Sequence, residues 1–174
     1  MKKILVLFVA LMMMVMPAMA DQPDYVNMKD DELQTIVDSA RNELVKRQLE
    51  EDGKILLFEQ DGISVYLTGE YETDWMDYIL IKAIVINNTD KKYDIHPEDT
   101  TISVNGWDAA ALTDLKAKPG QKKKGSIAFR PEDADIKTSD EIQDMVFYFS
   151  LRFEGGKWQH LGPYTVHVDN YIPY

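Results

Sequence analysis

The spacing of apolar residues along the chain changes once, close to Gly53. Before that glycine, apolar side chains recur every three or four residues, as they do on one face of a helix. This stripe consists of Leu33, Ile36, Val37, Ala40, Leu44 and Val45. The spacing predicts an amphipathic helix at about residues 29–51, and Gly53 is a residue type that commonly ends a helix.

After Gly53, apolar and polar residues alternate, which predicts β-strands and no second long helix. The clearest alternation runs from Met145 to Phe153. Residues 63–68 alternate as in a half-buried strand. Residues 78–86 are nearly all apolar, which is typical of a central strand. A shorter strand is expected at residues 109–112.

Turn-forming pairs separate these stretches, notably Asp61-Gly62, Asn105-Gly106 and Pro119-Gly120. About seven or eight strands follow one another at intervals of roughly 8 to 12 residues. The helices that would connect parallel strands are missing. The pattern therefore predicts a mainly β protein, an antiparallel β-sandwich with one N-terminal α-helix.

The first twenty residues have the three parts of a secretory signal peptide. Lys2 and Lys3 precede an apolar run from Ile4 to Val15, and Ala18-Met19-Ala20 supplies the small residues of a cleavage site. The apolar run is too short to span a bilayer. The alternative is an uncleaved membrane anchor, but the sequence turns polar and acidic directly afterwards, at residues 21–24. We therefore predict cleavage after Ala20 and a secreted or periplasmic protein.

This leader gives the chain three expected parts: a signal peptide at 1–20, an N-terminal amphipathic helix within 21–53, and a sandwich domain at 54–174. The chain has no cysteine. A lipoprotein anchor, thiolate zinc sites and cysteine nucleophiles are therefore excluded. Loss of Lys2 and Lys3 with the leader takes the formal net charge from −11 to −13. Such an acidic surface predicts no nucleic-acid partner and no association with a membrane after signal cleavage.

Four stretches in a fixed order carry a resemblance to a known class of domain. They are Ile84-Val85-Ile86-Asn87-Asn88-Thr89-Asp90-Lys91, Val104-Asn105-Gly106-Trp107, Pro119-Gly120-Gln121-Lys122, and the strand entered from Ile142 through Phe149. Over about residues 54–169 the chain resembles the secreted immunoglobulin-like β-sandwich domains of Gram-positive and gut bacteria. The resemblance implies an immunoglobulin-like fold and a non-enzymatic interaction role, and it supplies no catalytic motif.

Residue patterns that mark catalysis or metal binding are missing from the sequence. The three histidines, His96, His160 and His167, have no partner at metal-ligand spacing. An EF-hand loop starting at Asp133 would need glycine and glutamate where Thr138 and Asp144 stand. Nucleophile elbows and phosphate-binding glycine loops are also missing. We therefore expect no metal, no cofactor and no enzymatic activity, although paired carboxylates defined only by distance leave an unrecognised hydrolase open.

An aromatic cluster gives the best candidate ligand surface. Tyr71, Trp75 and Tyr78 surround the charged stretch 72–74, which is expected to join two strands at one end of the sandwich. Exposed aromatic rings there would suit a protein or glycan partner. The alternative is that these rings belong to the core, and we expect at least one of Trp75, Trp107 and Trp158 to be buried.

Five lysines form the one basic island of this acidic chain: Lys116, Lys118, Lys122, Lys123 and Lys124. The favoured interpretation is a solvated hairpin whose lysines discourage edge-to-edge pairing of strands. The alternative is a docking patch for an anionic partner, such as a wall polymer or an acidic protein surface.

Together these features predict an exported, non-catalytic binding module. The alternatives are a small secreted enzyme inhibitor, which would use the loop from Arg130 to Glu141, or an unrecognised hydrolase. The apolar stripe of the helix must be covered. We expect it to fold back on the sandwich of a monomer, with a helix-mediated dimer as the alternative.

Overall fold

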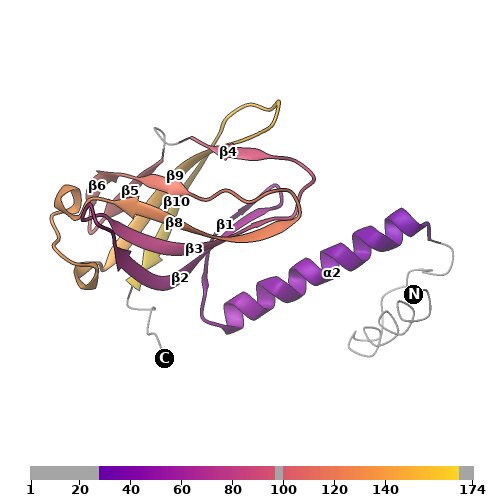
Figure 1. Ribbon diagram of the computed structural model, residues 1–174, viewed down its shortest axis with the longest axis horizontal. Helices are drawn as coiled ribbons and strands as arrows, with labels where there is room; N and C mark the ends of the chain where they lie inside the picture. The colour runs from indigo at the N-terminus through magenta and orange to yellow at the C-terminus, as the bar shows by residue number, and fades with distance from the viewer. Residues whose placement is uncertain (1–27, 97–99, 169–174) are drawn as a thin grey trace. The chain divides into compact units, whose positions relative to one another are not determined.

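The computed structural model describes residues 28–96 and 100–168, and these form one long helix and two antiparallel β-sheets (Figure 1). The two sheets share one hydrophobic core, so the fold is an immunoglobulin-like β-sandwich. This confirms the predicted fold class. The predicted signal peptide, residues 1–20, lies outside the described residues.

The first sheet has the strand order β1-β2-β3-β8-β7. Its strands are β1 (Ile55–Gln60), β2 (Ile63–Thr73), β3 (Ile79–Asn87), β8 (Gln121–Phe129) and β7 (Leu112–Asp114). The second sheet has the order β10-β9-β5-β6, and β4 also pairs with β9. Its strands are β10 (Gln159–His167), β9 (Asp144–Phe153), β5 (Thr101–Val104), β6 (Trp107–Ala110) and β4 (Tyr93–Ile95). Two short 3-10 helices, η2 (Pro131–Ala134) and η3 (Ser139–Glu141), lie between β8 and β9.

The strand expected at 109–112 is two strands that belong to different sheets. Ala109 lies in β6 and pairs with Ile102 of β5, whereas Leu112 lies in β7 and pairs with Ala128 of β8. Ala111 stands between them and is 2% exposed. The chain thus passes from one sheet to the other through one buried residue. With this division the described residues contain ten strands, more than the seven or eight expected from the sequence.

Phenylalanines, rather than tryptophans, fill the middle of the core. Phe147 and Phe149 on β9 stack at 6.1 Å between ring centroids, and Phe58 lies 5.2 Å from Phe149. Trp75 is 87% exposed and Trp107 is 56% exposed, and Trp158 is half-buried. The expectation that a tryptophan would be buried in the core is wrong, because the alternating phenylalanines of β9 already occupy the space between the sheets.

Helix α2 (Asp30–Glu51) confirms the predicted helix within one residue. The chain divides into two compact units between Ala40 and Arg41, so the end of α2 belongs to the same unit as the sandwich. Leu49 is buried there, in a small apolar cluster with Tyr66 and Ile86 on the outer face of the first sheet.

This packing corrects two expectations. Strand β2 was predicted to be half-buried, yet residues 63–67 are all buried because the end of α2 covers their outer face. The helix contacts the sheet through Val45 and Leu49, whereas Leu44 of the expected stripe is 53% exposed. Among the described residues, no helix is long and apolar enough to cross a membrane.

Candidate functional site

The turn between β2 and β3 presents the most exposed aromatic residue described in the chain. Trp75 is 87% exposed and its neighbour Met76 is 50% exposed. A carboxylate oxygen of Asp74 accepts hydrogen bonds from the backbone N–H groups of Met76 and Tyr78, each at 2.9 Å. Asp77 has a positive φ of 62°, in the left-handed region that aspartate tolerates in turns. Trp75 and Met76 therefore lie on a turn whose backbone is held in place by the side chain of Asp74.

Tyr71 does not share this exposure. Strand β2 carries a bulge, because three residues, 68–70, stand opposite Lys82 alone between the pairs Leu67–Ala83 and Tyr71–Ile81. Because the bulge adds two residues to β2, Tyr71 stays on the face of Val65 and Leu67, which is turned to the core. The ring of Tyr71 packs against the core cluster, and burial raises the pKa of its hydroxyl. Tyr71 therefore contributes to packing next to the turn.

Tyr78 is half-buried and already engaged by another side chain. The Nε of Arg130 donates a hydrogen bond to its hydroxyl at 2.9 Å, and the Arg130 guanidinium carbon lies 5.3 Å from the ring centroid. Arg130 also pairs with Glu132 at 3.3 Å. Of the three aromatic residues predicted as a ligand surface, Trp75 is therefore the one whose ring is open to a partner.

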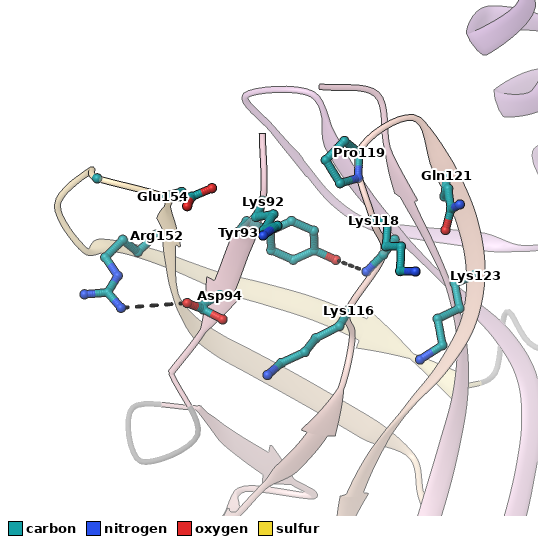
Figure 2. A pocket seen from close by; sticks show the side chains of 12 residues that line it. Lys92, Tyr93, Asp94, Lys116, Lys118, Pro119, Gln121, Lys123, Arg152 and Glu154 are labelled. Atoms are coloured by element: carbon teal, nitrogen blue, oxygen red, sulfur yellow. Dashed lines mark hydrogen bonds and ion pairs between the residues drawn. The ribbon is translucent and has the colours of Figure 1, made fainter. Parts of the chain in front are cut away.

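A second candidate site lies at the other end of β3. Here a cleft of about 930 Å³ opens between β4 and the connector that joins β7 to β8, residues 115–120 (Figure 2). We call it the basic cleft, because five cationic side chains and two carboxylates line it. The cations are Lys92, Lys116, Lys118, Lys123 and Arg152, and the carboxylates are Asp94 and Glu154.

The lysine island of the sequence is divided between two surfaces. Lys123 lines the basic cleft, whereas Lys124 lines a separate depression on the first sheet. The reason is strand alternation, since neighbouring residues of β8 point to opposite faces. Lys92, which directly precedes β4, and Arg152 of β9 also line the cleft and were missed, because no local pattern links residues so far apart in the chain.

A buried tyrosine holds the two sides of the basic cleft together. The hydroxyl of Tyr93 donates to the carbonyl oxygen of Leu115 at 2.5 Å and accepts from the N–H of Ala117 at 3.0 Å. Burial raises the pKa of this hydroxyl to about 12, so it stays protonated at neutral pH. The side-chain amide of Asn87 donates to the carbonyl of Ala117 at 3.2 Å. The connector is thereby fixed to both sheets.

Close packing of β7 against β8 also fixes this connector. A Cβ at Gly125 would lie 2.3 Å from the carbonyl oxygen of Asp114, so only glycine allows the two strands to approach this closely. In Figure 2 the side chain of Lys116 extends from the connector toward the part of the cleft where Asp94 lies. The Asp94 carboxylate pairs with Arg152 at 3.7 Å, and the Arg152 guanidinium stacks on Trp158 at 4.3 Å.

The histidines lie in separate places on the second sheet. His160 Nδ1 is 2.8 Å from the hydroxyl of Ser150, which is fully buried, and His167 Nδ1 is paired with Asp144. His96 packs edge-on against Trp158. Within the described ranges, no three His, Asp or Glu side chains gather as a metal site would require.

The loop from Arg130 to Glu141, the candidate inhibitory loop, is mostly exposed. It forms η2 and η3, and Ala134 and Ile136 are buried.

No family model matches this chain, and no curated protein matches it. Among solved structures, the chain is similar to a crystal structure of the GAE domain of yeast GGA1. The two share 11% sequence identity with a TM-score of 0.33, and the match covers 70% of this chain and 99% of that domain.

Proposed function

We propose that this protein is an exported, non-catalytic binding module that engages a partner protein through the β2–β3 turn. The observation that carries the proposal is the position of Trp75, 87% exposed beside the half-exposed Met76 on a turn braced by Asp74. Burial of a large, preorganised aromatic ring is a common source of binding energy in protein interfaces. The leader at residues 1–20 supports export.

A protein partner fits this turn better than a glycan does. Sugar binding of the kind expected from the sequence would use several coplanar exposed rings. Tyr71 packs on the core and Tyr78 is held by Arg130, so these residues add no open ring beside Trp75. In the inhibitor alternative, the loop 130–141 would present its exposed residues from two short helices. We keep a monomer as the expected state, since the end of α2 packs on its own sandwich.

The experiment starts from the mature protein immobilised as bait for extracellular and cell-envelope proteins, followed by affinity measurement with the purified partner. We expect Trp75→Ala to weaken binding at least thirtyfold, roughly the effect of losing one hot-spot residue. Trp107→Ala is the matched control, since Trp107 is also exposed but lies on β6. Equal affinity of the Trp75→Ala variant and the wild type would refute the proposal. Loss of binding in both variants would refute the assignment to the turn.

A further inference from the structure

Beside the basic cleft, strand β4 has a strand partner on one of its two edges within the residues that the structure describes. Among the described strands, β4 pairs with β9 alone. The N–H of Glu154 donates to the carbonyl of Lys92, and the N–H of His96 donates to the carbonyl of Ser150. In an antiparallel pair, hydrogen-bonded residues alternate with residues whose backbone groups point away from the partner. The N–H and C=O groups of Tyr93 and Ile95 therefore face away from β9.

The charges next to this edge favour an anionic ligand. Lys92, Lys116 and Lys118 are all exposed, and none of them forms an ion pair with a residue that the structure describes. The other two cations of the cleft are partly neutralised, Lys123 by Asp114 at 3.4 Å and Arg152 by Asp94. On a protein with a formal charge of −11, this group of lysines is a local site of positive potential.

We propose that the basic cleft binds an extended acidic peptide segment, which adds as a further strand to the edge of β4 that faces away from β9. The backbone groups of Tyr93 and Ile95 that face away from β9 would pair with the peptide main chain, as in other cases of strand addition, and Tyr93 is the one of the two that lines the cleft. The lysines of the connector would pair with its carboxylates. The backbone N–H and C=O groups along a strand edge favour a peptide over an acidic polysaccharide, because a polysaccharide has no repeating main-chain amides that could pair with them.

The dimensions and rigidity of the cleft suit this ligand. A volume of about 930 Å³ lies within the range of ligand sites in proteins and accommodates a short extended peptide. The two hydrogen bonds of Tyr93 hold the connector at a fixed position from β4. Little ordering of the protein is therefore needed when a peptide binds.

The test uses the whole mature protein, residues 21–174, and a fluorescently labelled copy of the peptide acetyl-Glu-Val-Glu-Val-Glu-amide as the probe. Binding is measured by fluorescence anisotropy in a titration at low salt. We expect the double variant Lys116→Glu/Lys118→Glu to weaken binding about tenfold or more, as the loss of two ion pairs and their replacement by repulsion implies. Lys122→Glu/Lys124→Glu is the matched control with the same change in net charge, because neither residue lines the cleft. Equal weakening by both variants would show a nonspecific charge effect and overturn the proposal.

Two further probes decide whether the ligand must be a peptide. A copy of the probe with alternate amide nitrogens methylated keeps its charge but cannot donate to β4, and we expect it to bind at least about tenfold more weakly. Heparin represents a non-peptide polyanion. If the methylated peptide binds as well as the parent, or heparin competes at equal charge concentration, the cleft recognises charge alone and strand addition is refuted. Trp75→Ala should leave probe binding unchanged, which separates this site from the β2–β3 turn.

Discussion

The two ends of β3 differ in shape, chemistry and construction. At its start, where Ile79 pairs with Phe129, the β2–β3 turn projects Trp75 into solvent. At its end, where Asn87 pairs with Gln121, the chain surrounds the recessed basic cleft. The turn is one continuous stretch braced by a single carboxylate, whereas three separate segments build the cleft. One end thus offers apolar surface, and the other offers charge.

Because of this difference, ligand binding at the two surfaces should respond differently to salt. Binding through Trp75 would draw on burial of apolar area, which added salt weakens little. Binding in the basic cleft would draw on attraction between exposed charges, which salt screens. Binding at each of the two surfaces can therefore be measured separately in the same protein, by choosing the salt concentration or by substituting residues of the other surface.

The largest expected effect comes from Tyr93→Phe. This change leaves the carbonyl of Leu115 and the N–H of Ala117 without their buried partner. We expect the free energy of unfolding to fall by about 1–3 kcal/mol, measured by urea denaturation. Tyr78→Phe is the matched control at the other end, since its hydroxyl bonds to the exposed Arg130, and it should cost about 0.5 kcal/mol or less. Equal losses of unfolding free energy in the two variants would contradict the view that the Tyr93 hydroxyl is more important for stability than the Tyr78 hydroxyl.

Alkaline pH should remove the contribution of Tyr93 gradually. Its folded-state pKa is raised to about 12 from the usual 10.0, so the native state favours the protonated hydroxyl. The contribution is complete below pH 10 and is lost as the pH rises from 10 through 12. The difference in stability between wild type and Tyr93→Phe should therefore shrink over this range. A difference that stays constant up to pH 12 would contradict the assigned pKa.

Salt should separate the two surfaces directly. Raising NaCl from about 0.05 M to about 0.5 M shortens the screening length severalfold. We expect probe binding in the basic cleft to weaken by about tenfold, and binding of the partner protein at Trp75 to change by less than about twofold. Titrations of both ligands at the two salt concentrations test this. A similar salt dependence at both sites would mean that the turn also binds mainly through charge.

The smallest effect is expected from Asp74→Ala in the turn. The variant loses two hydrogen bonds to a charged acceptor at an exposed site, and we expect a cost of about 1 kcal/mol in unfolding free energy. Asp74→Asn keeps an oxygen acceptor and should recover most of this stability. Partner binding through Trp75 should weaken in the alanine variant because the turn is no longer held in shape. Normal partner affinity in that variant would show that preorganisation is unimportant.

How much was predictable depends on how local each feature is. The turns at Asp61-Gly62 and Asn105-Gly106 are confirmed, and all four residues have positive φ values. These turns depend on neighbouring residues, which the sequence displays directly. The break at Ala111 was not predictable, because Ala109 and Leu112 are drawn to different sheets by partners elsewhere in the chain.

The candidate sites show the same division. The exposed turn was located from its own residues, and the alternation of β2 already places Tyr71 on the core face, whereas the state of Tyr78 depends on a distant residue. Tyr71 shares the core-facing side of Val65 and Leu67, because the bulge of β2 adds an even number of residues, and Tyr78 is held by Arg130, which lies 52 residues later. The basic cleft also required Lys92 and Arg152, which lie in other parts of the chain. Spacing along one segment cannot show such neighbours, since strand pairing determines them.

The alternation along β8 has a consequence for how this protein tolerates changes in length. Lys123 faces the basic cleft and Lys124 faces the other side of the sheet. A single-residue insertion between Lys124 and Gly125, with the pairing of residues 125–129 maintained, would move Lys123 and Lys124 to the opposite faces. An insertion of two residues would restore the original facing. In this strand, the parity of an insertion or deletion should therefore matter more to ligand binding than its size.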